Sequence, residues 1–408
     1  MCLPFPITPM KSETNDPTFP LGALVSLESL ARDPYPILAE LRATEPISWV
    51  PNPGMWFVTR YDDCIAILKD TETFTTHSPN STILGTFGPQ MLSLDGPGHR
   101  RHRGPCNAVF WPKTVRETLA ARIRDRVARL IDAFASHGEV ELREEFASRL
   151  AVEVVALAIG IPPEDAGMIR GWYERFADAL ANFSGDADVR QRGLDTAELF
   201  RDYLRPHLRR VTAAPDQSLL GVLANATADR LADEEIFSNA MIVLFGGIET
   251  TESMMLNAMW AFLTHRTPYE AIAWNPELLR NAIEESLRWD PAVQTCTRHA
   301  TCDAIVRGVT IRHGETVQCM LGGANRDPEQ FPEPDTFDIH RANAADHLTF
   351  GHGRHLCIGK HLALLEAGIG LGELVRRLPG LELNQEQSTP PHGHEFRKPT
   401  RLHLMWSH

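Results

Sequence analysis

The chain has 408 residues, and its hydrophobic fraction of 43% is enough to bury a substantial core. Lysine and arginine total 40 against 53 aspartate and glutamate residues, and the formal net charge of -13 argues against attraction to nucleic acid or to an anionic membrane surface. We therefore expect a soluble, acidic protein that binds neither.

The start of the chain and its cysteines bear on location. The first twenty residues, MCLPFPITPMKSETNDPTFP, contain no basic segment followed by an apolar run, and no stretch of ~18 apolar residues able to span a bilayer. We expect residues 1–20 to form a loose tail. The seven cysteines are widely spaced and include no C-x-x-C pair, which argues against a disulfide framework. A reducing cytoplasm is the expected location.

The first third of the chain predicts helices interrupted by a small β element. The pattern indicates a short amphipathic helix, two strands around the turn-prone PNPG, a second helix, an irregular loop that could cover a site, and a longer helix. These elements cover residues 33–46, 47–50, 55–61, 62–70, 79–98 and 115–135.

Helical patterns dominate the rest of the chain. Helices continue to about residue 211, and residues 232–265 predict a further helix of about thirty residues, which would be ~45 Å long. Another amphipathic helix follows at 276–290, then a hairpin with glycine turns at 304–321 and an irregular stretch at 325–341. Because no linker, repeat or low-complexity block divides the chain, we expect one mainly α domain over residues 1–408.

One cysteine stands out by its surroundings. It is Cys357, in the segment FGHGRHLCIG at 350–359, where glycines permit a tight loop and the following residues are apolar at helical spacing. The sulfur would lie at a helix N-terminus, where free N–H groups favour a thiolate. Three interpretations remain open: an ordinary half-buried cysteine, a zinc site with His352, His355 and His361, or a single axial thiolate on haem iron. Only the last explains why one cysteine suffices.

The same segment resembles the haem-binding loop of the cytochrome P450 monooxygenases and matches the pattern F-G-x-G-x-H-x-C-x-G at every fixed position. The resemblance implies that Cys357 is the proximal ligand of a haem b, with Phe350, Gly351, His355 and Gly359 also binding the cofactor. It further implies the family's mainly α (α+β) fold, a triangular helical prism with a small β subdomain that encloses the haem.

A second motif, GGIETT, interrupts the long apolar helix at 246–251. Glycine costs about 1 kcal/mol relative to alanine inside a helix, so either tight packing or a bound group explains the pair. The resemblance implies an acid–alcohol pair, in which Glu249 and Thr250 deliver protons to bound dioxygen while Gly246 and Gly247 leave room for oxygen and porphyrin. Glutamate stands where the family more often has aspartate, so the reach of Glu249 affects the proton route.

A third motif is EESLRWDP, in which Glu285 and Arg288 lie three residues apart on one helical face. Such a pair is ordinarily solvated. The resemblance instead implies the family's E-x-x-R motif, with Arg341 completing a buried structural network beneath the haem loop.

The haem propionates need cationic or hydrogen-bonding partners. The segment HRRHR would by itself indicate a basic surface, but the resemblance places His99, Arg103, Arg298 and His355 around the propionates.

A mostly apolar substrate pocket follows by analogy, although each of its residues could equally belong to an ordinary core. The residues are Ile83, Leu92, Phe183, Ile242, Phe245, Val293, Thr295 and Phe396.

The resemblance implies a monooxygenase that uses O2 on a small or medium apolar organic substrate, by hydroxylation or by O- or N-dealkylation. We expect a monomer that receives electrons from a separate ferredoxin or flavodoxin, with Arg101, Arg354 and Lys360 near the docking face. Two alternatives remain: a peroxide-driven peroxygenase or decarboxylase of the same fold, and a non-catalytic haem-thiolate ligand binder or gas sensor.

Overall fold

The computed structural model describes residues 18–182 and 185–407. In these residues α-helices predominate, joined by shorter 3-10 and π turns. The helices are α1 Leu27–Arg32, α2 Tyr35–Thr44, α3 Tyr61–Lys69, α4 Thr82–Phe87, α5 Gly96–Phe110, α6 Pro112–Asp132, α7 Ser148–Ile159, α8 Ala166–Leu180, α9 Ala187–Ala213, α10 Leu219–Ala224, α11 Asp233–Thr264, α12 Arg266–Trp274, α13 Leu279–Trp289, α14 Leu321–Ala324 and α15 Lys360–Arg377.

Short strands make up the β structure. They are β1 Ile47–Val50, β2 Met55–Val58, β3 Phe74–Thr75, β4 Glu139–Glu141, β5 Thr295–Ala300, β6 Ala304–Val306, β7 Val309–Ile311, β8 Thr316–Met320, β9 Glu382–Leu383 and β10 His403–Met405.

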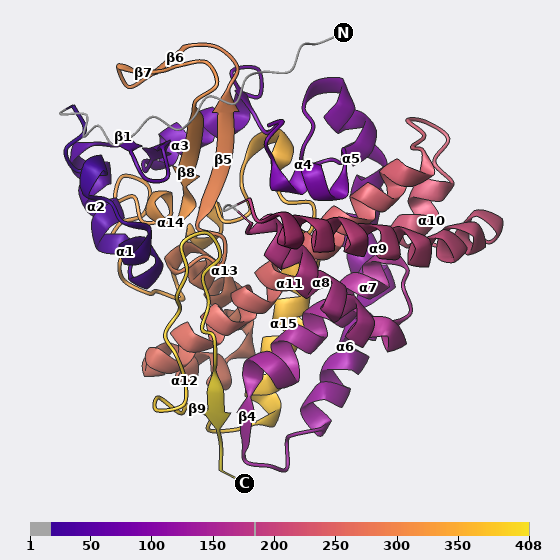
Figure 1. Ribbon diagram of the computed structural model, residues 1–408. Helices are drawn as coiled ribbons and strands as arrows, with labels where there is room; N and C mark the ends of the chain where they lie inside the picture. Colours follow the sequence, from indigo (N-terminus) through magenta and orange to yellow (C-terminus); the bar gives the residue numbers. More distant parts are fainter. Residues whose placement is uncertain (1–17, 183–184, 408) are drawn as a thin grey trace.

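The long helix α11 crosses the centre of the molecule (Figure 1) and confirms the prediction for residues 232–265. Its first turn carries three acidic residues, and the side chain of Glu235 accepts a hydrogen bond from the backbone N–H of Ala232 at 2.8 Å. Most of its residues are buried because α7, α13 and α15 pack around it. It therefore provides a rigid wall inside the protein.

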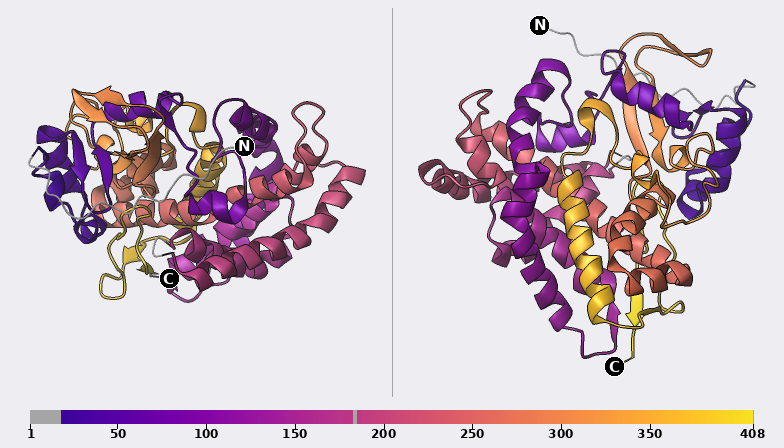
Figure 2. Two further views of the ribbon diagram at one scale, coloured as in Figure 1. Left: turned by 45° about the horizontal axis from the view of Figure 1, so that its top comes forward. Right: turned by 180° about the vertical axis from the view of Figure 1, so that it is seen from behind.

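The sheet and several of the remaining helices lie on opposite sides of α11. Figure 1 shows the five-stranded sheet with α2 and α3 on one side and α8 to α10 on the other. Seen from behind in Figure 2, α6 and α15 run side by side and the outline narrows toward the C-terminus, so that it is roughly triangular. This arrangement agrees with the mainly α fold expected from the sequence. No helix in the described ranges is long and apolar enough to cross a membrane.

The five-stranded sheet has the order β1-β2-β8-β5-β3. Strands β2 and β8 are parallel, with Trp56 opposite Val317, and the other pairs are antiparallel. The hairpin predicted at 304–321 is therefore only partly correct. Residues 304–311 form the β6–β7 hairpin, but β8 leaves it and pairs with β2 and β5. Its residues 317–320 are buried on both faces, which requires the interior of the protein.

Two loop predictions also need correction. The stretch 79–98 contains α4, which begins after Ser81, whose side chain accepts a hydrogen bond from Leu84 N at 3.2 Å, and ends at Gly88, with φ of 80°. In the predicted tail, Phe19 packs edge-on against Trp56 at 5.1 Å between ring centroids, so this residue is anchored. Residues 1–17 of that tail lie outside the described residues.

Candidate functional site

A cavity of about 360 Å³ lies between α11 and the loop that precedes α15. Its lining is mostly apolar and comes from both halves of the chain. The predicted site residues that line it are Ile83, Leu92, Arg103, Ile242, Phe245, Gly246, Gly247, Thr250, Val293, Thr295, Phe350, Gly351, His355, Cys357, Gly359 and Phe396. The predicted pocket residue Phe183 lies outside the described residues. A more open depression of about 470 Å³ near Arg122 and His207 holds none of the predicted site residues.

The cysteine loop has the tight conformation that its glycines predict. The backbone N–H of Cys357 donates to the carbonyl of Phe350 at 2.8 Å, which closes the loop. Gly351 and Gly353 have φ values of 70° and 72°, and a Cβ on Gly353 would lie 2.8 Å from the carbonyl oxygen of Leu68. These positions therefore require glycine for backbone reasons alone.

The Cys357 thiol faces the cavity at the start of α15. Burial raises the pKa of this thiol, while the N–H groups of Gly359 and Lys360 and the charge of Arg103 act to lower it. The geometry fits one sulfur ligand for a metal held in the cavity. Among the described residues no three His, Cys, Asp or Glu side chains converge on a common point, so the zinc interpretation has no ligand set.

The predicted propionate partners lie together, and two of them have unused donors. The rings of His99 and His355 are 4.4 Å apart between centroids. His99 Nε2 and Arg298 Nε are buried without a hydrogen-bond partner in the described part of the chain. Burial is also the main cause that lowers the pKa of His99 to about 4. Buried nitrogen donors beside a cavity with a thiol fit a carboxylate-bearing iron porphyrin, so the haem expected from the sequence passes this test.

The other two predicted partners are engaged by the protein itself. Arg103 Nη2 donates to the carbonyl of Leu356 at 2.6 Å, which ties α5 to the cysteine loop. His355 Nε2 lies 2.7 Å from Asp95 Oδ1. Burial acts to raise the pKa of Asp95, but its hydrogen bonds with His355 and with Thr75 outweigh burial and lower the pKa. Asp95 orients His355, and sequence reasoning missed it.

The acid and the alcohol of the second motif point in different directions. Thr250 lines the cavity, and its hydroxyl donates to the carbonyl of Gly246 at 2.5 Å. Glu249 is not part of the cavity wall, because neighbouring helix positions are about 100° apart around the axis. Its carboxylate instead lies 2.8 Å from Lys398 Nζ and accepts a hydrogen bond from the hydroxyl of Tyr173.

The surroundings of Glu249 keep it ionised. Burial acts to raise the pKa of this carboxyl, but Lys398 and Tyr173 outweigh it and lower the pKa. Lys398 Nζ also lies 2.7 Å from Glu252, which in turn is 2.7 Å from Arg143 Nε. A chain of alternating charges therefore leads from Glu249 away from the cavity. No sequence pattern indicated Lys398 or Tyr173 as its partners.

The paired glycines have separate causes. At Gly246 an added Cβ would meet no atom within 4 Å, so this position leaves open space beside the cavity. At Gly247 a Cβ would lie 2.6 Å from Cγ2 of Val155 on α7. Gly247 is thus explained by tight helix packing, which was the alternative interpretation, and Gly246 by room at the site.

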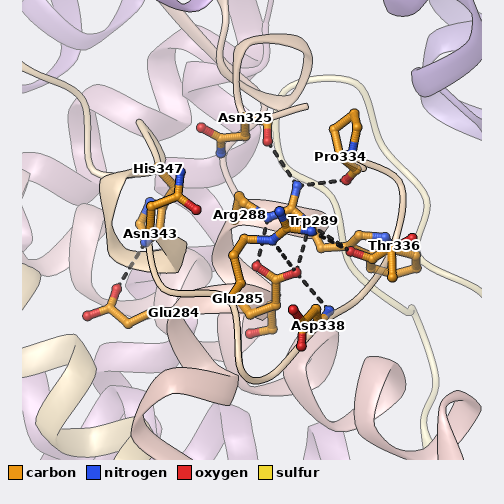
Figure 3. A network of polar contacts seen from close by, with 12 residues as sticks. Glu284, Glu285, Arg288, Trp289, Asn325, Pro334, Thr336, Asp338, Asn343 and His347 are labelled. Atoms are coloured by element: carbon orange, nitrogen blue, oxygen red, sulfur yellow. Dashed lines mark hydrogen bonds and ion pairs between the residues drawn. The ribbon is translucent and has the colours of Figure 1, made fainter. Parts of the chain in front are cut away.

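The E-x-x-R network is buried, as predicted (Figure 3). The guanidinium of Arg288 makes two 2.7 Å bonds to the carboxylate of Glu285, and Arg341 Nε adds a third contact at 3.2 Å. Arg288 also donates to the carbonyls of Asn325 and Thr336, and the backbone N–H of Asp338 donates to Glu285. These bonds fasten α13 to the irregular stretch that leads to the cysteine loop.

Arg101 does not lie beside the cysteine loop. It is two residues from Arg103 and faces the other side of α5, where Nη2 lies 2.6 Å from Glu235 Oε2 at the start of α11. The docking face that we expected for the electron donor therefore does not include Arg101. Arg354 is exposed in the loop, and Lys360 packs over the ring of Phe350 at 5.3 Å.

Comparisons with known proteins agree with this geometry. The family model described as Cytochrome P450 matches residues 197–403. The chain is 34% identical to the biotin biosynthesis cytochrome P450 of Bacillus subtilis, over 86% of this chain and 91% of that protein. It is also 34% identical to the cytochrome P450 monooxygenase PikC of Streptomyces venezuelae, over 92% and 91% of the two chains.

Solved structures resemble this one over nearly its whole length. The crystal structure of CalO2 has a TM-score of 0.86 at 29% identity and covers 93% of this chain and 97% of its own. The structure of P450BioI in complex with a fatty acid linked to acyl carrier protein has a TM-score of 0.84 at 32% identity, and covers 93% and 100%.

Proposed function

Because the chain belongs to the cytochrome P450 monooxygenase family, we propose that it inserts one atom of O2 into a small or medium apolar organic substrate. The products would be those of hydroxylation or of O- or N-dealkylation. The observation that carries this proposal is that the thiol of Cys357 and the hydroxyl of Thr250 face one apolar cavity from different elements. Bound there, haem b supplies the dioxygen activation that no protein side chain can perform.

Residues around the cavity would hold the haem in three ways. Cys357 is the iron ligand, and the N–H groups at the start of α15 lower the basicity of its sulfur. His99 and Arg298 offer their unused nitrogen donors to the propionates, with Arg103 and His355 beside them. Gly246, where an added Cβ would meet no atom within 4 Å, would leave room beside α11 for the porphyrin.

The protein's part in the chemistry is to exclude water and to place protons. Apolar side chains such as Ile242, Phe245 and Phe396 line the substrate side of the cavity and favour an apolar substrate. The hydroxyl of Thr250 lies at the cavity wall, where its lone pairs are free to accept a hydrogen bond from a bound group while it donates its own proton to the carbonyl of Gly246. Glu249, which lies on the same helix but faces away from the cavity, would support the delivery of protons to the cavity through Thr250. The retained Thr250 favours a monooxygenase over a peroxide-driven enzyme.

We place the electron donor, an acidic ferredoxin or flavodoxin, at the surface of the cysteine loop, where Arg354 and Lys360 supply positive charge. The protein would act as a cytoplasmic monomer. Arg354→Ala and Lys360→Ala should slow reduction by such a donor and weaken its dependence on salt, whereas Arg266→Ala, in an exposed pair with Glu270, should not. Equal reduction rates in all three variants would exclude this docking face.

The visible spectrum of the reduced protein under carbon monoxide tests the proposed function. A thiolate-ligated haem gives a Soret band at unusually long wavelength, and the Cys357→Ser variant should lose it while still binding haem. The same band in Cys357→Ser would contradict the ligand assignment. Oxygen consumption that depends on an apolar compound and on the electron donor should follow; consumption of peroxide alone would favour the peroxygenase alternative.

A further inference from the structure

Two short segments of the cavity wall, residues 291–294 and 395–397, lie outside strands β1 to β10. They carry Val293 and Phe396, whose side chains line the cavity. An isolated β-bridge pairs these two residues, and a backbone hydrogen bond of 2.9 Å lies on each side of the bridge. Because so short a pairing is weak without further strands, the position of Phe396 depends on the side chains beside it.

Arg397, the residue directly after Phe396, forms a buried ion pair with Asp290. Its Nε lies 3.0 Å from Asp290 Oδ1, and each of the two residues is only 6% exposed. Asp290 follows the last residue of α13 and directly precedes the segment 291–294. The ion pair therefore joins both wall segments at one end of their pairing.

The remaining donors of Arg397 are also used. Nη1 donates to the carbonyl of Ala31 at 2.8 Å and Nη2 to that of Arg32 at 3.3 Å, at the end of α1. The last carbonyls of a helix have no partner within it, so the planar guanidinium completes this helix end as well. On the other side of the pair, the hydroxyl of Tyr35 donates to Asp290 Oδ1. These bonds leave the Arg397 side chain a single position.

A buried amide ties the same two segments to α11. Asn257 is only 3% exposed, and its Nδ2 donates to the carbonyl of Asp290 at 3.0 Å and to that of Arg397 at 2.9 Å. It lies about two helical turns after Thr250 on α11. The spacing between the wall that carries Phe396 and the wall that carries Thr250 is therefore fixed by direct hydrogen bonds.

Phe396 meets a second aromatic ring across the cavity wall. Its ring and that of Phe245 on α11 are 6.4 Å apart between centroids and inclined at 81°, an edge-to-face arrangement. Phe245 is itself stacked on Tyr173 at 6.0 Å. The two rings form a corner that suits a flat apolar group, and a small displacement of Phe396 would open it.

We propose that Arg397, held by Asp290, is a specificity-determining positioning residue that fixes Phe396 at the substrate side of the cavity. This inference rests on the proposed function and deepens it. Arg397 does not touch the substrate; it acts through the ring of the preceding residue. The corner of Phe245 and Phe396 then selects apolar substrates that present a planar ring.

Hydrogen–deuterium exchange of the haem-loaded protein tests the positioning. In Arg397→Met the amide of Gln294, which donates to the carbonyl of Glu395 at 2.9 Å, should exchange roughly tenfold faster because the two segments separate more often. Exchange in α6 should not change. Arg376→Met, which breaks an exposed ion pair with Glu373, is the control and should match wild type at Gln294. Unchanged exchange at Gln294, or an equal rise in α6, would overturn the proposal.

Two nitrogen ligands of different length test the selectivity. Imidazole binds haem iron without reaching Phe396, whereas the phenyl ring of 4-phenylimidazole extends into the cavity. In Arg397→Met we expect the affinity for 4-phenylimidazole, measured from the visible spectrum of the ferric protein, to fall roughly tenfold while that for imidazole is unchanged. Arg397→Lys keeps a charge beside Asp290 and should restore part of the affinity. An equal loss for both ligands, or none, would overturn the inference.

A double-mutant cycle shows whether Arg397 acts through Phe396. Phe396→Ala should weaken binding of 4-phenylimidazole by itself, and adding Arg397→Met should cause no further loss. Additive losses would place the action of Arg397 elsewhere and overturn the inference. If Arg397→Met does not fold, Asp290→Asn, which removes the charge at constant size, takes its place in all three experiments.

Failure of the proposed function would look different. A wild type that binds neither imidazole nor 4-phenylimidazole would contradict the haem assignment. Exchange at Gln294 would still decide whether Arg397 holds this wall of the cavity, because that measurement does not depend on a ligand of the iron.

Discussion

Two nitrogens of Arg288, Nε and Nη2, each lie 2.7 Å from a carboxylate oxygen of Glu285, one turn earlier on α13, and neither side chain is exposed. Removing one partner of such a buried pair costs far more folding free energy than the intact pair contributes, because the remaining charge stays buried without its counterion. Arg288→Ala should lower the free energy of unfolding by about 3–5 kcal/mol, because among the described residues it leaves Glu285 with Arg341 as its only cation.

Denaturant unfolding of the purified variants measures this effect. Arg32→Ala, which breaks the exposed ion pair with Glu28, is the matched control and should change stability by less than about 1 kcal/mol. Similar losses in the two variants would show that the buried network does not hold the structure together.

Lys398 should set the ionisation of Glu249. Its charge and hydrogen bond lower the pKa of this carboxyl against the effect of burial, so Lys398→Met should raise the pKa. If ionised Glu249 supports turnover, the acidic limb of the kcat–pH profile moves to higher pH in this variant. Lys113→Met, which removes an exposed lysine 3.9 Å from Glu117, serves as control. A profile that does not move would remove Glu249 from the proton route.

His99 and Arg298 should control how firmly haem is held. Each offers a buried nitrogen without a partner in the described residues, and a propionate deprived of it would be poorly compensated. His99→Phe and Arg298→Leu should each speed haem loss roughly tenfold, equivalent to about 1.4 kcal/mol. Transfer of haem to an excess of apomyoglobin measures the rate. Arg101→Ala should leave it unchanged, since Arg101 pairs with Glu235 instead; equal rates in all variants would refute the assignment.

The two glycines of α11 should respond oppositely to alanine. Gly247→Ala places a methyl 2.6 Å from Val155 Cγ2, and overpacking of this kind destabilises by about 1–3 kcal/mol. Gly246→Ala meets no atom within 4 Å and should stabilise the helix by up to about 1 kcal/mol while narrowing the cavity. Thermal unfolding distinguishes them, and Val155→Ala should rescue Gly247→Ala in a double-mutant cycle. Additive effects of the two changes would contradict the contact.

Glu366 should make stability fall as pH rises. The folded protein holds this proton up to a pKa of about 8, whereas the unfolded chain releases it near 4.5. The stabilisation is therefore complete below the unfolded pKa and is lost between these two values. Glu366→Gln lacks this loss, so its stability relative to wild type should rise by at most about 1.4 kcal/mol per pH unit in that window. Melting temperatures of both proteins across the window check this, and parallel curves would contradict it.

The sequence predicted those parts of the site that depend on local chain geometry. The glycines and Cys357 of 350–359 lie within one loop, and the apolar run of α11 identifies itself by length and composition. Contacts between residues that are far apart in the chain could not be predicted from local sequence patterns. Asp95 and His355 are 260 residues apart, and Glu249 finds Lys398 on the C-terminal segment. Such contacts depend on packing angles that no local pattern encodes.

Glu366 shows that a signal can be present and still be overlooked. It is a single acid in the apolar stretch HLALLEAGIG, directly after the cysteine loop. Amphipathic helices commonly place such an acid on their solvated face, and only the position of α15 between α6 and α11 shows that this face is buried. The same limit explains Gly247, whose neighbour Val155 belongs to another helix.

The parallel pairing of β2 with β8 has a consequence for biosynthesis. The β1–β2 hairpin ends at Val58, but β8, the partner of β2, ends only at Met320. While the chain is being synthesised, the apolar edge of β2 therefore stays unpaired until most of the helical part has left the ribosome. Contacts this distant in sequence form late and slowly. Completion of the sheet is thus a late event of folding, which fixes β5, and with it Arg298, in place.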